Sequence, residues 1–428
     1  MELLKAVACR AIDDNARDLK ELGAAVWMYA ETGGREMKTS CVIRNFLKDK
    51  GFSMSSYKGM RTSFKAEWGE GEFGGAKRPN IGFLCRYDAS YNGHVRGNNL
   101  VVEVTIGAAL GVQEAIRAST SKIGKVTIIG CPNSAKHWLV YLLNWKQFKD
   151  LDVVLSATPG PRTVWNPVYL GSKVFRATYK TGDVQQVSAP EALAGSIFAI
   201  TNILTVQEHF DRGWKTEGII SDGGNDARQT PLHCEATVRI TAPNNVGMAL
   251  LEKRTVPCLE AASTTTRCLL NLDMASKSIY SMLNNTLLGY CLQLNAYHSG
   301  VLSTPLKPRD LVLGPEDVGN LSLVLPSVRP MYYVGTDEEV GTPAFRDAVN
   351  TETAHHYTVA MAKALAMTAL DVMISSETLS NVKEEHCRNV RAIKEVKFEP
   401  FAVSKSTELP VVPLPLPQDS NSGWSKIM

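Results

Sequence analysis

A dense polar loop directly follows a short apolar run near residue 85. Residues 81–85 are typical of a strand buried on both faces, and helical spacing resumes at Val101. Between them, Asp88 and His94 form a candidate proton-transfer pair, because an imidazole titrates near neutrality. The alternative is that both residues serve packing alone. Ligands collect beyond the carboxyl ends of strands in α/β sheets, so we expect any functional site to lie on this loop.

The same loop carries a resemblance to a known family. The matching frame is Gly82-Phe83, Tyr87-Asp88-Ala89, Gly93-His94, Gly97 and Asn99-Leu100. On these residues the chain resembles the M20 peptidases and amidohydrolases, in particular the aminoacylase-like branch that includes M20-domain dipeptidases. The likeness covers about residues 5 to 378, which is nearly all of the folded part. The resemblance implies a catalytic-type domain with an inserted lid that also makes a dimer contact.

The resemblance also implies two zinc ions with Cys, His and Glu ligands. In this sequence the ligand positions hold Arg96, Asn98, Ala135, Thr158 and Gly341, and Ser134 replaces the catalytic base. Zinc in proteins takes thiolate, imidazole or carboxylate ligands, about three of them in a catalytic site. Arg and Asn cannot replace these, and a fixed guanidinium repels a cation. We therefore expect no metal, no other cofactor and no zinc-dependent hydrolysis.

Several cations lie on the loops that, by the resemblance, face the zinc ions. Without metals, such a cluster offers compensating charge for an anionic small molecule. The alternative is that Arg86 and Arg96 pair with acids and plug the former site. The acids available for this are Asp88, Glu103, Glu316 and Asp317. The candidate ligand-binding residues on these loops are Arg86, Tyr87, Tyr91, Arg96, Asn98, Ser134, Lys136, His137 and Thr158, with Trp138 as a further aromatic wall.

The lid residues that the resemblance assigns to the substrate differ as well. Gln185 replaces a His that reaches across the dimer, and Gln can donate a hydrogen bond but cannot become cationic. Arg228 replaces an Asn that binds the substrate carboxylate, and Thr241 replaces an Arg. We keep Gln185 and Arg228 as candidate ligand contacts and expect that recognition of a peptide terminus has changed.

Apolar periodicity predicts the elements that position these loops. Helices are expected within residues 5–50, with a break at 32–34, and then strands at 64–68, 81–85, 126–130 and 153–156 alternate with helices at 101–118 and 135–146. This order indicates an α/β fold with a mostly parallel sheet that helices cover on both faces. A helix at 279–297, a strand at 327–334 and a helix at 351–374 complete it, and His355 and His356 are expected on a solvated face.

The middle of the chain has a different order. Residues 171–181, 216–221, 234–241 and 264–271 read as strands, and residues 190–209 and 246–262 read as helices. This is the ferredoxin-like β-α-β-β-α-β motif. We assign residues 1–168 and 276–399 to the catalytic-type domain, residues 169–275 to the inserted lid and dimerisation domain, and residues 400–428 to a Pro-rich extension.

Composition excludes several classes of protein. The chain has 428 residues, 44% hydrophobic and 21% charged, and a net charge of +3, which is too small to indicate a nucleic-acid partner. It has no apolar run of about 18 residues and no signal-peptide core at its N-terminus, so we expect no membrane partner. Nine Cys without a Cys-x-x-Cys pair indicate buried thiols and a cytoplasmic location.

Three functional hypotheses follow. The first is a metal-independent enzyme that binds a small, anionic metabolite and transforms it by cyclisation, condensation or isomerisation, since positioning and electrostatics alone can lower such barriers. The second is an inactive pseudoenzyme that binds a metabolite or regulates an active homologue. The third is a residual hydrolase with other ligands. The cationic cluster favours the first, because a site that decays without selection should drift toward small or apolar residues. A homodimer through the lid is expected in each case.

Overall fold

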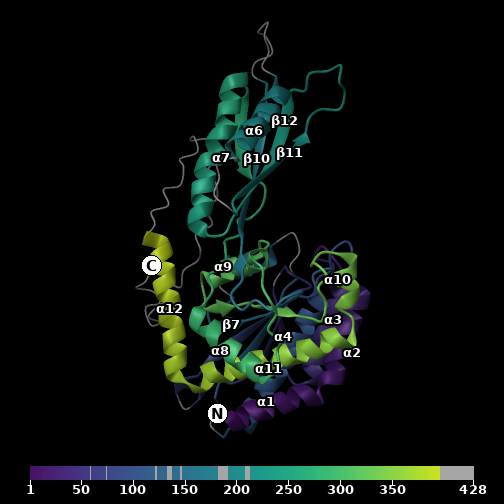
Figure 1. Ribbon diagram of the computed structural model, residues 1–428, viewed down its shortest axis with the longest axis vertical. Coiled ribbons are helices and arrows are strands. Elements are labelled where there is room, and N and C mark those ends of the chain that lie inside the picture. The colour runs from purple at the N-terminus through teal and green to yellow at the C-terminus, as the bar shows by residue number, and fades with distance from the viewer. Residues whose placement is uncertain are drawn as a thin grey trace.

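The computed structural model describes residues 1–57, 59–73, 75–120, 123–132, 137–144, 147–181, 191–207 and 213–395. Ser134, Lys136 and Gln185 and the Pro-rich extension therefore lie outside the described residues. Figure 1 shows an elongated molecule in which a smaller domain, carrying α6 (Ala192–Gln207) and α7 (Asn245–Thr266), stands on a larger main domain.

The main domain is built on a six-stranded sheet with the order β1-β2-β6-β5-β7-β15. These strands are β1 (Ser53–Ser56), β2 (Phe64–Gly69), β5 (Asn80–Cys85), β6 (Lys125–Gly130), β7 (Val153–Leu155) and β15 (Ser327–Val328). Neighbours from β6 to β15 pair in parallel, and β2 alone runs in the opposite direction. The α/β fold and the mostly parallel sheet are confirmed, whereas β1 was not predicted.

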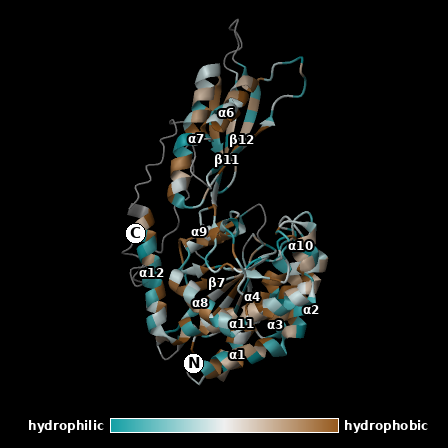
Figure 2. Cartoon of the chain, viewed as in Figure 1, coloured by the Kyte–Doolittle hydropathy of each residue, from teal (hydrophilic) through white to brown (hydrophobic). Residues whose placement is uncertain are grey.

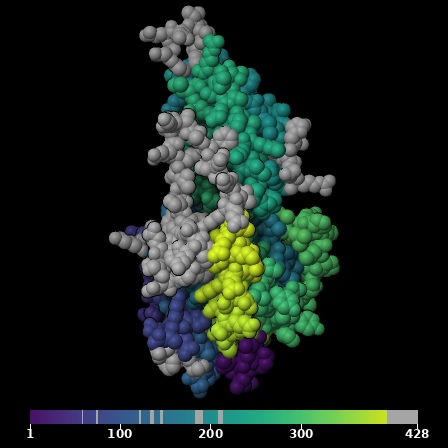
Figure 3. Space-filling model, turned by 90° about the vertical axis from the view of Figure 1, so that its left-hand side faces the viewer, coloured from purple at the N-terminus to yellow at the C-terminus, as the bar shows by residue number. Residues whose placement is uncertain are grey.

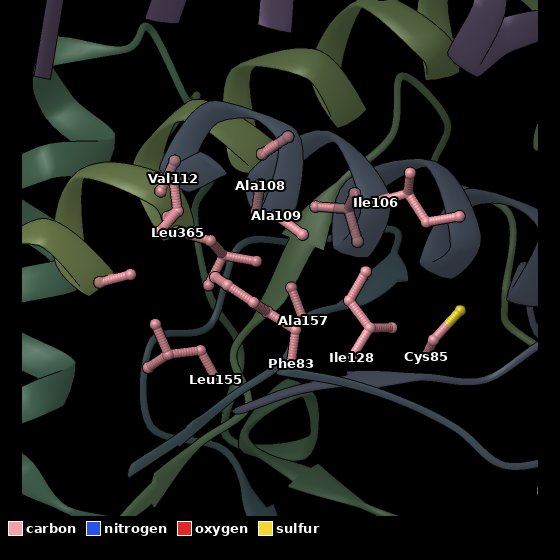
Figure 4. Close-up of a cluster of buried hydrophobic side chains, with 14 of the residues drawn as sticks. Phe83, Cys85, Ile106, Ala108, Ala109, Val112, Ile128, Leu155, Ala157 and Leu365 are labelled. Carbon is pink, nitrogen blue, oxygen red and sulfur yellow. The ribbon is translucent and has the colours of Figure 1, made fainter. Parts of the chain in front are cut away.

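Helix α4 (Asn98–Ala118) is the centre of the main core. It packs against β5 and β6 on one side and against α11 (Glu352–Ile374), α1 (Glu2–Asp14) and α2 (Ala16–Tyr29) on the other. Glycine allows the close approach, since a Cβ at Gly107 would lie 3.1 Å from Leu19 and 3.2 Å from Ala362. Figure 4 shows strand residues Phe83, Ile128 and Leu155 facing the helix residues Ile106, Ala109 and Val112.

Both α4 and α11 are long and apolar enough, by length and composition, to cross a membrane. However, 94% of the most apolar window of α4 and 72% of that of α11 lie buried inside the protein. Burial of this extent is what core helices of a globular fold show, and it explains why α4 is apolar on all sides.

The first predicted helical stretch is two helices that meet at Asn15. They are α1 (Glu2–Asp14) and α2 (Ala16–Tyr29), and α3 (Met37–Asp49) follows them. The side chain of Asn15 donates to the carbonyl of Ala11 at 2.8 Å, which satisfies the end of α1. The break predicted at 32–34 is confirmed, because Gly33 and Gly34 both have the positive φ that favours glycine.

The smaller domain is a four-stranded antiparallel sheet with two helices. Its elements are β10 (Gly171–Lys180), α6 (Ala192–Gln207), β11 (Lys215–Asp222), β12 (His233–Ala242), α7 (Asn245–Thr266) and β13 (Leu269–Met274). The strand order β11-β12-β10-β13 is the ferredoxin-like arrangement, so that prediction is confirmed. Helix α7 continues to Thr266, so the last strand begins at Leu269 rather than at residue 264.

Two linkers join the domains, and α9 (Val318–Ser322) holds one of them. The side chain of Asn320 accepts from the backbone of Tyr280 at 3.1 Å and donates to the carbonyl of Ser278 at 3.0 Å. The outgoing linker contains β9 (Val168–Tyr169), which pairs with β14 (Val312–Leu313). Because the returning linker is extended, α8 (Thr286–His298) begins seven residues later than the predicted position 279.

Helix α12 (Ser376–Glu395) was not predicted and runs along one side of the main domain, as Figure 3 shows. Its Glu385 accepts from the backbone of Thr286 at 2.7 Å and of Leu287 at 2.9 Å, which caps α8. His355 was expected on a solvated face, but it contacts the buried Glu103 at 2.7 Å. The remaining elements are β3 (Glu72–Phe73), β4 (Ala76–Lys77), α5 (Trp138–Asn144), β8 (Thr158–Gly160), η1 (Pro308–Leu311), β16 (Met331–Tyr333) and α10 (Pro343–Ala348).

Candidate functional site

Arg86 is the first residue after the central strand β5. Cys85 faces α4 (Figure 4), so Arg86 points to the opposite face of the sheet, where α5 and α9 lie. Its guanidinium pairs with Asp317, and the two side chains are 1% and 0% exposed. Burial lowers the pKa of Arg86, but the Asp317 carboxylate outweighs this and the pKa is raised, so the charge persists.

The neighbours of this ion pair complete its hydrogen bonding. Nη1 of Arg86 donates to the carbonyls of Cys131 at 3.4 Å and Pro132 at 3.3 Å. The second oxygen of Asp317 accepts from the backbone of Leu139 at 3.3 Å. Arg86 is therefore committed to protein partners and does not face solvent as a ligand group. Asp317 is one of the acids that the plugged-site alternative offered.

The residues at the zinc-ligand positions of the resemblance come together in space. The backbone N–H of Gly341 donates to the carbonyl of Val95 at 2.8 Å, next to Arg96. A Cβ on Gly97 would lie 2.5 Å from Pro159, which follows Thr158 in β8. These contacts join three loops that are distant in sequence, and they support the register on which the resemblance was drawn.

Asp88 and Asn98 lie at the floor of this region. Both are buried, and the Asn98 amide donates to the carbonyl oxygen of Asp88 at 2.8 Å and to its carboxylate at 3.4 Å. Arg96 is exposed, and the structure records no ion pair for it among the described residues. Thr158 is half-buried, and its backbone donates to the carbonyl of Pro330 at 2.9 Å. Arg96 is thus the accessible cation of the first loop.

His94 makes no hydrogen bond to Asp88 among the described residues. Its ring is 2% exposed, and Nε2 lies 2.9 Å from the carbonyl of Val26 on α2. Nδ1 has no hydrogen-bond partner among the described residues. Burial lowers the pKa of His94 to about 4, so the imidazole is neutral at pH 7. The structure gives His94 a packing role between the loop and α2.

The three aromatic residues that were predicted to line the site lie in three different environments. Tyr87 is fully buried, stacks on Phe64 with ring centroids 5.9 Å apart, and donates to the carbonyl of Thr62. It therefore belongs to the core. Tyr91 is fully exposed, at 101% of the reference area. Trp138 is half-buried and lies over Gly34, where a Cβ would meet its ring at 3.6 Å.

His137 is the remaining cationic candidate in the described residues. It is half-buried and has φ +50, a left-handed conformation that is uncommon outside glycine. Burial lowers its pKa; Asp317 opposes this shift and Arg86 adds to it. His137 therefore lies close to the Arg86–Asp317 pair while keeping contact with solvent.

Arg228 is not brought to this region. It lies on the loop between β11 and β12 of the smaller domain, and its side chain is 89% exposed and paired with Asp226 at 2.9 Å. Nothing in these contacts connects it with the carboxyl ends of the main sheet.

Sequence reasoning missed Arg329, which follows β15 at the same edge of the sheet. It is 2% exposed, and Nη2 lies 3.1 Å from Glu316. The signal that could have identified it is an arginine inside the apolar run 321–334, where a charge must be either exposed or paired.

No group of three or more His, Cys, Asp and Glu side chains that could hold a metal ion occurs among the described residues. At the converging positions the chain offers the guanidinium of Arg96, the amide of Asn98, the hydroxyl of Thr158 and, at Gly341, no side chain. None of these is a thiolate, imidazole or carboxylate, so this donor set does not fit zinc.

Solved structures superpose on both domains of this chain. A dinuclear metal-binding peptidase of the M20 family from Bacillus subtilis superposes with a TM-score of 0.61 at 15% identity, over 82% of this chain and 98% of its own. An aminobenzoyl-glutamate utilization protein from Klebsiella pneumoniae gives a TM-score of 0.62 at 11% identity, over 84% of this chain and 98% of its own. These likenesses define the class of fold.

Curated sequences place the chain within that class. The mouse Xaa-Arg dipeptidase is 30% identical over 407 residues, which are 90% of this chain and 92% of the mouse protein. The human Xaa-Arg dipeptidase is 29% identical over 408 residues, with the same shares. No protein-family model matches the sequence. The chain belongs to the M20 family of peptidases and amidohydrolases and is related to the Xaa-Arg dipeptidases.

Proposed function

We propose that this M20 family member has lost zinc-dependent hydrolysis and binds a small anionic metabolite at the carboxyl edge of the main sheet. The observation that carries the proposal is the convergence of Arg96, Asn98, Thr158 and Gly341 where the family resemblance expects metal ligands. Three of the loops that the resemblance assigns to the ligands meet, and the residues at their ligand positions carry no thiolate, imidazole or carboxylate, which supports the proposal. The buried Arg86–Asp317 pair nearby is neutral overall and fixes the loops on this edge.

The anionic character of the ligand follows from which charges stay accessible. Arg96 is exposed and His137 is half-buried, whereas the charge of Asp317 is matched by its ion pair with Arg86. An anion that reaches this edge therefore meets the guanidinium of Arg96, a cation for which the described residues supply no ion pair. Tyr91 and Trp138 flank these loops in the sequence and retain exposed surface for an organic ligand.

Transformation of the ligand is the second candidate, and His137 favours it. Its left-handed backbone and its lowered pKa are features that cluster at functional sites. A neutral imidazole beside a fixed Arg–Asp pair can accept a proton from a bound substrate without a metal. In this version the protein catalyses a cyclisation, condensation or isomerisation, with His137 rather than His94 as the base.

Metal content and hydrolysis test the loss of zinc chemistry. We expect substoichiometric zinc by elemental analysis of the purified full chain, and no turnover of Xaa-Arg dipeptides or N-acyl amino acids with added zinc. Xaa-Arg dipeptides are the most stringent test substrates, because the two curated relatives are named Xaa-Arg dipeptidases. Two bound zinc ions with turnover would overturn the proposal.

Ligand binding is tested by thermal unfolding with a library of carboxylate and phosphate metabolites. A ligand that binds the native state raises the melting temperature with its concentration. We expect this stabilisation to disappear in Arg96→Gln and to persist in Arg17→Gln, a control whose side chain is 89% exposed and paired only along α2. Stabilisation that survives Arg96→Gln would contradict the assigned site. His137→Gln separates the two candidates, because it should abolish turnover while binding remains.

We also propose a homodimer through the smaller domain. Strand β11 is an edge of its sheet and exposes Ile219, and α6, which packs against β11, exposes Phe198 and Leu204 and is apolar along its length (Figure 2). An unpaired edge with apolar neighbours fits a second copy of the same strand. Light scattering should show a dimer that Ile219→Lys dissociates. Leu269→Lys, on the opposite edge strand β13, is the matched control, and a dimer that resists Ile219→Lys excludes this surface.

A cytoplasmic location remains part of the proposal. All nine cysteines are free, which suits a reducing compartment.

A further inference from the structure

Arg329 is a buried arginine whose hydrogen-bonding capacity is mostly unused. It has one ion-pair contact, from Nη2 to Glu316 at 3.1 Å. Its Nε and Nη1 atoms are buried and have no hydrogen-bond partner among the residues that the structure describes. A guanidinium carries five N–H bonds, so three of them, one on Nε and two on Nη1, have no acceptor in the described part of the chain. A buried polar group in this condition calls for a partner that the chain itself does not supply.

Arg86 provides an internal comparison. It is equally buried and also has one acidic partner, but two backbone carbonyls accept from its Nη1, so only Nε is unmatched. Arg86 has the hydrogen bonding of a residue that fills space and fixes loops. Arg329 has no such backbone acceptors among the described residues, although its guanidinium also interacts with the hydroxyl of Tyr169.

The position of Arg329 places those donors at the proposed site. It follows β15, which pairs with β7, and the next residue, Pro330, accepts from the backbone of Thr158. Val328 packs in the main core, so the side chain of Arg329 points to the opposite face of the sheet, as Arg86 does. The carbonyl of Arg329 accepts from the hydroxyl of Tyr169, in the linker to the smaller domain, at 3.3 Å.

We propose that the guanidinium of Arg329 holds the carboxylate of the small molecule that this protein binds. The inference rests on the proposed function and names the group that the ligand presents. A carboxylate is the fitting acceptor, because it offers about four lone-pair positions to the three unmatched N–H bonds and makes charge-assisted hydrogen bonds. Glu316 is the more exposed member of the ion pair, with 17% of its side chain exposed.

Nuclear magnetic resonance of the full chain, labelled with 15N-arginine, tests the proposal directly. Buried arginine Nε–H groups exchange slowly enough to be observed, and through-bond assignment of Arg329 does not depend on any variant folding. The probes are sodium acetate, sodium chloride at matched ionic strength, and acetamide as the neutral isostere of acetate. We expect a saturable shift of the Arg329 signal with acetate and none with the other two.

Arg329→Lys keeps the charge but loses the planar set of donors, so it should weaken acetate binding by about tenfold. In this variant the binding is measured from the signals of the other labelled arginines. Arg17→Lys is the control and should bind as the wild type does. Three outcomes overturn the inference: an Arg329 signal unmoved by acetate, one moved equally by chloride, or one moved equally by acetamide. If acetate moves Arg96 but not Arg329, the proposed anion site stands and this inference fails. If no arginine responds to any anion, both fail.

Discussion

Separating Arg86 from Asp317 should be among the most costly substitutions in the main domain. Asp317→Leu leaves a guanidinium that is 1% exposed without its counter-ion and removes the acceptor of the Leu139 N–H. Arg86→Met leaves a fully buried carboxylate unpaired. Breaking a buried pair by removing one partner costs about 3 to 5 kcal/mol. We expect about 5 kcal/mol for Asp317→Leu, because it orphans a backbone donor as well, and about 4 kcal/mol for Arg86→Met.

The double variant should recover most of this loss, since two apolar side chains of similar volume remove both charges together. Its cost should be no more than about 2 kcal/mol, which leaves a coupling of several kcal/mol between the two sites. Urea unfolding followed by tryptophan fluorescence measures all four proteins. The control cycle uses Arg17 and Glu21, which are 89% and 65% exposed and should couple by less than about 0.5 kcal/mol. Single variants that cost less than about 1 kcal/mol each and add in the double variant would refute the buried pair.

Three further predictions concern individual positions. His94 has a pKa of about 4 in the folded protein against 6.5 in the unfolded chain, so the unfolded chain takes up the proton first as the pH falls. The free energy of unfolding should therefore decrease between about pH 6.5 and pH 4 by up to about 3 kcal/mol. His94→Gln should flatten that part of a pH profile measured by urea unfolding, and an unchanged profile would contradict the prediction. Gly23→Ala would place a Cβ 1.9 Å from the buried carboxylate of Glu103 and push that carboxylate away from His355. The free energy of unfolding should fall by at least about 2 kcal/mol, and a thermal melt unchanged from wild type would disprove this. Restoring Cys at 96 and His at 98 should not restore zinc-dependent hydrolysis, because Thr158 and Gly341 still lack ligand side chains; turnover would show that the register is wrong.

The fold could be predicted because its signals are local. Apolar runs of strand length and the spacing within residues 101–118 identify β5, β6, β7 and α4 without knowledge of any distant contact. The predicted start of α8 was wrong because tertiary contacts, rather than local sequence, determine where this helix begins. The segment from Ile279 stays extended because it bridges Ser172 and is held by Asn320, so α8 starts only at Thr286.

The site was harder to predict because the burial and pairing of its side chains depend on residues far away in the chain. Arg86 and Asp317 are 231 residues apart, and the sequence offered several acids without a means of choosing among them. His94 binds the carbonyl of Val26, a backbone group that no side-chain pattern reveals. Arg329 follows a strand of only two residues, where a charge is ordinarily solvated, so its burial could be learned only from the packing of α9 and β15.

The burial of α4 has a consequence for how the chain is made. Its main helical neighbour, α11, is encoded roughly 250 residues later, and the whole smaller domain is synthesised in between. At about 5 to 20 residues per second, the ribosome needs on the order of 10 to 50 seconds to supply α11 after α4 has emerged. During that interval a predominantly apolar helix lacks one of the helices that cover it, while the smaller domain, which has its own core, can already fold. Nascent chains of this protein should therefore engage chaperones between the synthesis of these two helices and be released when α11 appears.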